Sequence, residues 1–392
     1  MRVLFVTHSF PRFVGDPPGS FLLRLARGLM ARSLEVCVVA PSAPGLGGAE
    51  VLDGVPVVRF RYAPRRWETL AYTGSMAEDV RRSSRAKLAM AGLMVATRAT
   101  LRRVVREFRP AVVHAHWWFP SGLAAAAGGV ASIPLITTLH GTDVRLAREL
   151  RAAVPFLRHV MSRSSEVTAV SRFVADEARR LVPGASPAIA PMPAATELFR
   201  PPGESDRRGL LFVGRLNAQK GVAALLRALS VLDPSVTLDI VGHGSDRDAL
   251  VETARRLGVD ERVRWHGALP QQRLAALFGA AALVVVPSVE EGLGLVAVEA
   301  LLCETPVVAY RSGGLVDVVD DGVTGMLVDP GTSDALAATV RRLLGDPARA
   351  AAMGRAGRAR MLERFSPESV TERYLEIYGR AMAPAASRGR GA

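Results

Sequence analysis

The segment from residue 283 to residue 309, LVVVPSVEEGLGLVAVEALLCETPVVA, constrains the fold more than any other part of the chain. Residues 283–286 form a short, β-branched apolar run that is typical of a buried strand. After a loop that contains two glycines, residues 295–302 have the apolar spacing of a helix, and residues 307–309 begin another strand. A strand, a glycine loop, a helix and a second strand make a βαβ unit, in which ligands bind beyond the carboxyl end of the strand.

The loop and the helix start of this unit carry groups that suit an oxygen-rich ligand. Gly292 and Gly294 allow a ligand to approach the backbone closely, and the helix that begins at Leu295 offers N–H groups. Glu291 in the loop and Glu299 on the helix add two acceptor side chains, and this combination fits a polyhydroxylated ligand. A solvated loop glutamate and a helix-face glutamate explain the same residues without a ligand. The segment alone favours neither interpretation.

The spacing P-S-x-x-E-G-x-G-L-x-x-x-E-A resembles the signature of family 4 retaining glycosyltransferases with the GT-B fold. In that family the first glutamate contacts the donor sugar and the second contacts the nucleotide ribose, and the matching residues are Glu291 and Glu299. Leu293 stands where the family usually has an aromatic residue, and its backbone N–H is the group that the resemblance assigns to the donor. The resemblance extends over nearly the whole chain and implies two doubly wound Rossmann-like α/β domains that face a central cleft.

Length and cysteine content set the broad class of protein. With 392 residues, 49% of them apolar, the chain is long enough for two domains with cores of their own. Cys37 and Cys303 are far apart in sequence and lie in or beside apolar runs, which argues against a disulfide framework and favours a reducing, cytoplasmic location. The N-terminus is expected to be a strand and not a signal peptide. The uncharged stretch 111–142 is expected to be a buried strand, helix and strand and not a membrane span.

The positive charge of the chain is concentrated in one segment. The formal net charge is +13, and residues 59–109 hold 13 basic and 4 acidic side chains, which supplies +9 of it. This segment is predicted to be a loop followed by a helix over about 78–108, in which arginines alternate with Leu88, Met90, Leu93 and Met94. A basic helix with an apolar face suits an anionic membrane surface, and a helix packed on its own core with solvated arginines fits equally well. No base-reading motif accompanies the charge, so nucleic acid is not an expected partner.

The N-terminal domain is expected to open with a strand at 2–7, a Gly- and Pro-rich loop, a helix at 21–32 and a strand at 35–40. No G-x-G-x-x-G joins the first strand to the helix, so the dinucleotide-binding fingerprint is absent. By resemblance, Gly19 and Ser20 match the place where backbone amides of the family meet the donor phosphates.

Three residues at predicted strand ends are assigned to the acceptor side by resemblance. The strand at 111–116 ends at His116, and Trp117 follows it. In a parallel sheet these two side chains face the ligand end, whereas His114 is expected to pack. Ser171 matches the family at the end of a later strand.

The strand at 135–139 leads directly to His140. In the family the matching histidine lies beside the anomeric region of the donor sugar, where a neutral imidazole can hydrogen-bond the sugar. Asp143, three residues later, is predicted to be the N-cap of the next helix.

The C-terminal domain is expected to open with a strand at 210–213 and the loop GRLNAQKG. The loop is not a Walker A motif, because glycine follows the lysine, but it matches the family's G-R-L-x-x-x-K-G. By resemblance, Arg215 and Lys220 grip the donor diphosphate. Fixed cations stabilise the charge that develops on that leaving group, so they are expected to replace the metal ion that other transferases use. Leu269 is assigned to the nucleotide base pocket, also by resemblance.

The sequence therefore predicts an α/β protein with the GT-B fold. Its N-terminal domain is expected at 1–190, its donor-binding domain at 205–367, and a C-terminal helix at about 368–384 is expected to pack back on the first domain. The expected enzyme is a retaining hexosyltransferase-type glycosyltransferase (EC 2.4) in surface polysaccharide or glycolipid assembly. It would use a nucleotide-diphosphate sugar, a carbohydrate or lipid-linked acceptor, no cofactor and no metal, at the cytoplasmic face of the membrane or free in the cytoplasm. The alternatives are a soluble small-molecule acceptor, an epimerase or phosphorylase of the same fold, or a non-catalytic sugar-nucleotide-binding subunit.

Overall fold

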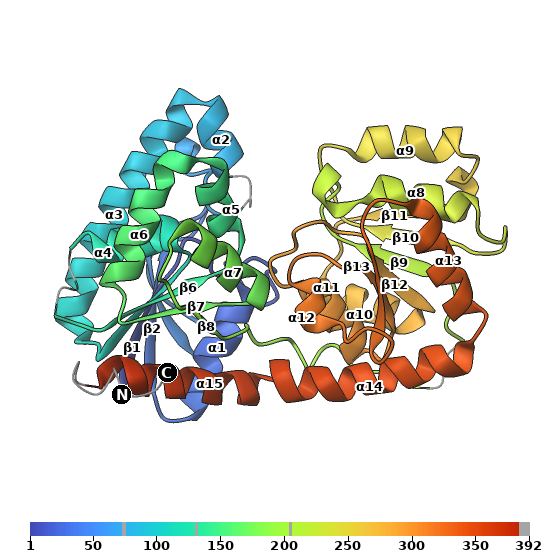
Figure 1. Cartoon of the computed structure of the whole chain (residues 1–392). Helices are drawn as coiled ribbons and strands as arrows, with labels where there is room; N and C mark the ends of the chain where they lie inside the picture. The colour runs from blue at the N-terminus through green and yellow to red at the C-terminus, as the bar shows by residue number, and fades with distance from the viewer. Residues whose placement is uncertain (73–75, 129, 131, 204–205, 384–392) are drawn as a thin grey trace. The chain divides into compact units, whose positions relative to one another are not determined.

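The computed structural model describes residues 1–72, 76–128, 130, 132–203 and 206–383 of the chain (Figure 1). The chain divides into two compact units. Unit 1 comprises Met1–Pro193 and the C-terminal segment that begins at Pro367, and unit 2 comprises Ala194–Ser366. Each unit is an α/β domain built around its own sheet.

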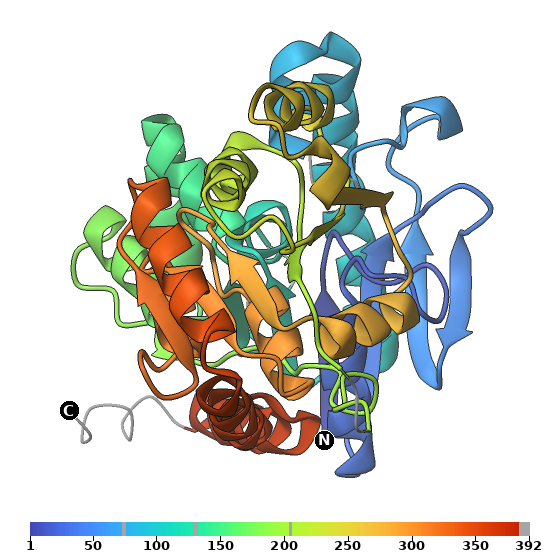
Figure 2. The same ribbon diagram turned by 90° about the vertical axis from the view of Figure 1, so that its right-hand side faces the viewer.

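The sheet of unit 1 has the order β3-β4-β2-β1-β5-β6-β7-β8. All of its described pairings are parallel except β3 with β4, which form an antiparallel hairpin at one edge (Figure 2). The strands are β1 Arg2–Val6, β2 Glu35–Pro41, β3 Gly48–Leu52, β4 Val55–Phe60, β5 Val112–His116, β6 Leu135–Leu139, β7 Glu166–Ala169 and β8 Ala188–Ile189. The central strands β1, β5 and β6 are almost entirely buried, as their unbroken apolar and Thr/His sequences require in a sheet that is covered on both faces.

The helices of unit 1 connect these strands. They are α1 Ser20–Ala31, α2 Met76–Arg82, α3 Ser84–Phe108, α4 Leu123–Ala126, α5 Thr142–Glu149, α6 Val154–Arg163, α7 Arg172–Leu181 and α15 Pro367–Met382, with short turns η1 Arg65–Trp67, η2 Trp118–Gly122 and η3 Arg151–Ala153. Two sequence predictions are wrong here. The single helix over 78–108 is two helices, because the backbone of Ser83 is extended and its hydroxyl accepts a hydrogen bond from the Ala86 N–H and so caps α3. The charged segment also does not begin in a loop, because Arg59 lies inside β4.

The C-terminal helix α15 packs on unit 1, beside α1 and against β5, β6 and β7 (Figure 1). Gly28 of α1 makes this possible, since a Cβ there would lie 2.2 Å from Thr371 Oγ1. Two buried tyrosines of α15 bind the sheet: Tyr378 Oη is 2.9 Å from His114 Nδ1, and the Tyr374 hydroxyl donates to the Ala190 carbonyl over 3.2 Å. His114 thus packs in the interior, as expected, and it is hydrogen-bonded to this helix.

The sheet of unit 2 is parallel throughout its described pairings, in the order β11-β10-β9-β12-β13-β14. Its strands are β9 Leu210–Val213, β10 Leu238–Val241, β11 Val263–Gly267, β12 Leu283–Val286, β13 Val307–Tyr310 and β14 Gly325–Val328. Its helices are α8 Val222–Ser230, α9 Arg247–Arg256, α10 Gln271–Ala280, α11 Leu295–Leu302, α12 Leu315–Val318, α13 Ser333–Leu344 and α14 Pro347–Phe365, with short turns η4 Ala218–Lys220 and η5 Asp260–Arg262. The predicted βαβ unit over 283–309 is confirmed as β12, α11 and β13.

The strand orders place one topological switch point in each sheet. In unit 1 the order reverses between β1 and β5, and in unit 2 it reverses between β9 and β12. Ligands of open α/β sheets bind beyond the carboxyl ends of the strands at such points. No helix in the part of the chain that the structure describes has the length and hydrophobicity needed to span a bilayer.

Candidate active site

The switch point of unit 2 is formed by the loops that follow β9 and β12, and the two loops are in direct backbone contact. The Val289 N–H donates to the Gln219 carbonyl over 2.8 Å, and the Gln219 side-chain amide donates to the Glu290 carbonyl over 3.1 Å. Gly221 has φ +69°, and a Cβ there would lie 2.0 Å from the Pro287 carbonyl oxygen. Only glycine fits this position, so the glycine after the lysine in GRLNAQKG is explained by the approach of the second loop.

The loop after β12 is held on its other side by residues 312–314, which follow β13. The Gly314 N–H donates to the Glu291 carbonyl over 2.6 Å, and the Glu290 N–H donates to the Ser312 hydroxyl over 3.0 Å. A Cβ on Gly313 would lie 2.4 Å from the Glu291 carbonyl oxygen. The loop that carries Glu291 is therefore fixed between two neighbouring loops.

The two loops bring Lys220 and Glu291 into an ion pair. Lys220 Nζ lies 2.5 Å from Glu291 Oε2, and their side chains are 19% and 20% exposed. Arg215 is exposed in the first loop, two residues after the end of β9, and Glu299 is half-buried on α11. The other predicted donor residues lie in or near the same loop. Gly292, Leu293 and Gly294 end the loop and Leu295 begins α11, while the half-buried Leu269 follows β11.

At the switch point of unit 1, the ends of neighbouring strands bring together an aromatic and histidine cluster. His116 ends β5 and His140 follows β6, and His116 Nδ1 is 3.3 Å from His140 Nε2. The Trp117 indole stacks on the His140 ring with centroids 4.1 Å apart and 24° between the planes. His8, which follows β1, lies edge-on to Trp117 with centroids 4.5 Å apart, and the sequence analysis did not single it out. Its position just after the predicted first strand, at the same edge of the sheet as His116 and His140, was the signal in the sequence that could have identified His8.

Asp143 is not the N-cap that the sequence suggested, because it lies inside the first turn of α5 and is buried. Its carboxylate accepts from the backbone N–H groups of Trp118 over 2.9 Å and of His140, Gly141 and Val144, each over 3.0 Å. One carboxylate thus fixes the loops after β5 and β6 relative to each other and holds the backbone of His140 in place.

The four histidines that lie close together in unit 1, His8, His114, His116 and His140, have lowered pKa values and are neutral in the folded protein near neutral pH. Burial lowers the pKa of His114 to about 3 and that of His8 to about 4. Burial, together with the neighbouring histidines, holds the pKa values of His116 and His140 well below the usual value. A neutral imidazole can donate or accept a hydrogen bond but carries no charge toward a ligand.

The other residues of unit 1 that were predicted to bind ligands, Ser171, Gly19 and Ser20, have structural positions at the starts of helices. Ser171 is fully buried, and its hydroxyl accepts from the Val174 N–H over 3.2 Å as the N-cap of α7. Gly19 precedes α1 with φ +72°, and a Cβ there would lie 2.5 Å from the Ser9 carbonyl oxygen, while Ser20 begins the helix. The backbone of the loop that follows β1 therefore requires glycine at position 19, independently of any ligand.

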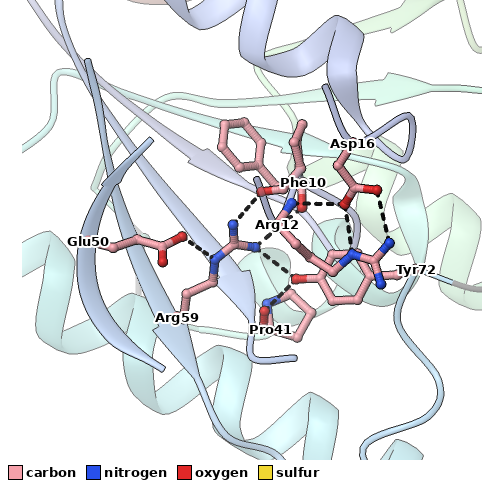
Figure 3. A network of polar contacts seen from close by, with 8 residues as sticks. Phe10, Arg12, Asp16, Pro41, Glu50, Arg59 and Tyr72 are labelled. Carbon is pink, nitrogen blue, oxygen red and sulfur yellow. Dashed lines mark hydrogen bonds and ion pairs between the residues drawn. The ribbon is translucent and has the colours of Figure 1, made fainter. Parts of the chain in front are cut away.

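The loop between β1 and α1 is held by a polar network that the sequence did not reveal (Figure 3). The side chain of Arg59 is fully buried; its Nε donates to Glu50 Oε1 over 2.7 Å and its Nη1 to the Tyr72 hydroxyl over 2.9 Å. It also donates to the carbonyls of Phe10 and Pro11. Within the loop, Arg12 and the buried Asp16 form two parallel contacts of 2.7 and 2.9 Å. Arg59 therefore connects β3, the loop after β1 and Tyr72, and its side chain is not part of a solvated or membrane-facing surface.

Replacing Arg59 by methionine is expected to lower the free energy of unfolding of unit 1 by about 3 kcal/mol, because the carbonyls and Glu50 lose a buried charged partner. Arg103→Met is the matched control, since Arg103 is 52% exposed and pairs over 3.2 Å with Glu107, which is 60% exposed, and its loss is expected to cost less than about 1 kcal/mol. Urea unfolding of both variants measures the difference. Equal stabilities of the two variants would contradict the role given to Arg59.

No group of three or more His, Cys, Asp and Glu side chains within the described residues is arranged to hold a metal ion. The charged groups at the donor-side loops and the start of α11 include Lys220, Arg215 and the carboxylates of Glu290, Glu291 and Glu299.

Comparison with known proteins agrees with this arrangement. Residues 19–191 match the family model described as Glycosyltransferase Family 4, and residues 195–360 match the model described as Glycosyl transferases group 1. The glycogen synthase of Mycobacterium tuberculosis (strain H37Rv) is 30% identical over 407 residues, with 96% of this chain and 94% of that protein covered. A D-inositol 3-phosphate glycosyltransferase of Xylanimonas cellulosilytica is 34% identical over 407 residues, with 94% and 93% covered.

Solved structures share the fold. Sucrose-phosphate synthase from Thermosynechococcus elongatus superposes with a TM-score of 0.80 at 23% identity, over 99% of this chain and 100% of that one. Anabaena HepE, solved in complex with UDP and glucose, superposes with a TM-score of 0.71 at 22% identity, over 97% and 99%. The family models and the full-length relatives show that the chain belongs to the family 4 glycosyltransferases and is an enzyme of the GT-B fold.

Proposed function

We propose that this glycosyltransferase moves a hexose-type sugar from a nucleoside-diphosphate donor to an acceptor hydroxyl, with retention of the anomeric configuration. The observation that carries the proposal is the position of Lys220 and Glu291 at the switch point of unit 2, next to the start of α11. Cations and backbone N–H groups there suit a diphosphate, and the carboxylates suit sugar and ribose hydroxyls.

In the proposed reaction the bond between the anomeric carbon and the diphosphate oxygen breaks, and both electrons stay on that oxygen. The anomeric carbon bonds to the acceptor oxygen, whose proton passes to the leaving diphosphate or to water. Lys220 and Arg215 stabilise the charge of the leaving group, and Glu291 and Glu299 bind the donor sugar and the ribose. The neutral His140, fixed by Asp143 and stacked on Trp117, hydrogen-bonds the donor sugar, and His116 and Trp117 contribute to the acceptor side.

The test is a donor screen by thermal shift, followed by a transfer assay. Nucleotide sugars with uracil, guanine, adenine and thymine bases are added to the protein, and a ligand that binds the folded state raises its melting temperature. At least one donor is expected to raise the melting temperature and to be consumed when an alcohol acceptor is present. Stabilisation by a donor that is never cleaved would favour a non-catalytic binding subunit instead.

Transfer is expected to proceed without a divalent metal, because Lys220 and Arg215 supply the positive charge at the diphosphate. With the donor found in the screen, excess EDTA is expected to leave the turnover rate unchanged. Loss of turnover in EDTA that magnesium or manganese restores would show that the cationic side chains do not suffice.

We further propose that the acceptor is carried at an anionic membrane surface, as in envelope polysaccharide or glycolipid assembly. On α3 the apolar Leu88 and Val95 are 63% and 70% exposed, and Arg85 and Lys87 are exposed beside them. Leu93, in contrast, is buried in the core of unit 1 and cannot contact lipid. The exposed members of the helix support an electrostatic and partly apolar surface contact.

Vesicle co-sedimentation tests this membrane contact. Each basic residue near an anionic surface is worth about 1 kcal/mol, so Arg85→Glu/Lys87→Glu is expected to lower the bound fraction on anionic vesicles at least about tenfold. Arg349→Glu/Arg355→Glu, on exposed positions of α14, makes the same charge change in unit 2 and is the control. Equal binding of wild type to neutral and anionic vesicles at low salt would leave the arginines as a solvated face and favour a soluble acceptor.

A further inference from the structure

In the donor site, the ammonium group expected to bind the diphosphate is paired with a carboxylate of the protein. Lys220 Nζ contacts Glu291 Oε2 at 2.5 Å. We propose that Glu291 competes with the nucleoside diphosphate for Lys220, and that this competition weakens the enzyme's hold on its nucleotide product. The inference rests on the proposed function, because it assigns a second task to a residue of the same donor site.

The pair differs from an ordinary surface ion pair because both partners are held by the backbone. Lys220 ends the turn η4, and the adjacent Gly221 packs so closely on the Pro287 carbonyl that no side chain fits there. Glu291 is fixed by the hydrogen bond from Gly314 to its carbonyl. Both side chains are about four-fifths buried, so the contact loses little conformational entropy and is only partly screened by solvent.

Glu291 and a diphosphate offer Lys220 the same kind of partner, an anionic oxygen. A diphosphate that binds Lys220 must approach the Glu291 carboxylate, and like charges at such distances repel each other. When the donor binds, the diphosphate takes the lysine and the carboxylate turns to the sugar hydroxyls. After transfer the sugar has left, and the carboxylate returns to the lysine as the nucleoside diphosphate dissociates.

Neutralising Glu291 is therefore expected to tighten the binding of the product while it impairs transfer. Isothermal titration calorimetry with UDP, GDP and ADP identifies the diphosphate that wild type binds. Glu291→Gln is expected to lower the Kd for that diphosphate at least about fivefold, the equivalent of one ion pair of about 1 kcal/mol. The Kd for the corresponding nucleoside, which has no phosphate, is expected to stay unchanged. An unchanged or higher Kd for the diphosphate would overturn the inference.

The matched control is Glu290→Gln, which removes the same charge from the adjacent loop position, whereas the contact with Lys220 is made by Glu291. It is expected to change the diphosphate Kd by less than about twofold. Tightening of the same size by both variants would show a general charge effect and would also overturn the competition. Thermal unfolding without ligand verifies that both variants are folded.

Lys220→Ala and the double variant Lys220→Ala/Glu291→Gln distinguish a failure of the proposed donor site from a failure of the competition between Glu291 and the diphosphate. Lys220→Ala is expected to weaken diphosphate binding, and Glu291→Gln is expected to give no tightening on that background, because the two residues act as a coupled pair. If Lys220→Ala binds the diphosphate as well as wild type, the proposed donor site itself is wrong. If Lys220→Ala weakens binding and Glu291→Gln alone does not tighten it, only the competition is wrong.

Discussion

Replacing Lys220 by alanine is expected to lower kcat/KM about 1,000-fold. A fixed cation about 4 Å from the developing negative charge contributes up to about 4 kcal/mol at an effective dielectric constant near 20, and each 1.36 kcal/mol is a factor of ten in rate. Arg215→Ala is expected to act in the same direction. The melting temperature is expected to fall by only a few degrees, because Lys220 lies at a loop end and is absent from the core of unit 2.

Steady-state kinetics with the donor from the screen, together with thermal unfolding, measure the two effects separately. Arg256→Ala is the control, because Arg256 is exposed on α9 of the same unit and its loss removes the same charge. Its kcat/KM is expected to equal that of wild type. Unchanged kinetics and a normal melting temperature in both Lys220→Ala and Arg215→Ala would remove the diphosphate role from this loop.

Unit 1 is expected to lose several kcal/mol of stability as the pH falls from about 6.5 to 4.5. The pKa of the buried His114 is lowered to about 3, and that of His116 is well below the usual 6.5. The unfolded chain therefore takes up protons in this window that the folded state does not, so the free energy of unfolding falls as the pH falls. For a single buried histidine the loss at pH 4.5 is about 3 kcal/mol.

The other titratable groups around these rings modify the effect without reversing it. His8 and His140 also have lowered pKa values and add to the loss. Burial raises the pKa of Asp143 to about 6, although the N–H donors around it act in the opposite direction. As the pH falls, this carboxylate takes up a proton in the folded state before it does so in the unfolded chain, and this offsets part of the loss of stability. Burial raises the pKa values of Tyr374 and Tyr378, which stay protonated throughout the window.

Urea unfolding followed by tryptophan fluorescence tests the pH dependence, because Trp67, Trp117 and Trp118 lie in unit 1 and Trp265 is the fourth tryptophan of the chain. His114→Asn is expected to reduce the slope of unfolding free energy against pH by up to about 1.4 kcal/mol per pH unit. The control is His159→Asn, at an exposed position of α6, which is expected to keep the wild-type slope. A wild-type stability that is flat between pH 7 and pH 4.5 would contradict the neutral histidine cluster.

The features that sequence reasoning identified are those that short segments determine. The strand, loop and helix from Leu283 to Leu302 follow from local apolar periodicity and two glycines, and the structure confirms these elements. The assignment of Lys220 and Glu291 to one donor site followed only from the resemblance, and their ion pair was not predicted. The two residues are 71 positions apart and meet through the order of the strands.

The features that sequence reasoning missed depend on partners far along the chain. Arg59 was counted with the exposed charge because its partners Glu50, Phe10 and Tyr72 are brought to it by the β3–β4 hairpin and the loop after β1. Asp143 has the position of an N-cap in sequence, yet besides the hydrogen bonds from the nearby N–H groups of His140, Gly141 and Val144 its carboxylate accepts one from Trp118, 25 positions away. Local capping rules do not describe the contact with Trp118, because the tertiary structure supplies that N–H donor.

Retention of the anomeric configuration can be measured directly with methanol as the acceptor, since a methyl glycoside does not mutarotate and keeps the configuration in which it forms. The protein is incubated with the α-linked nucleotide sugar from the donor screen, and the anomeric proton of the product is observed by NMR. A donor site built on Lys220, Arg215, Glu291 and Glu299 in a family 4 glycosyltransferase predicts the α-methyl glycoside together with one equivalent of nucleoside diphosphate. Formation of the β-methyl glycoside, or failure to release sugar from any nucleotide donor, would contradict it.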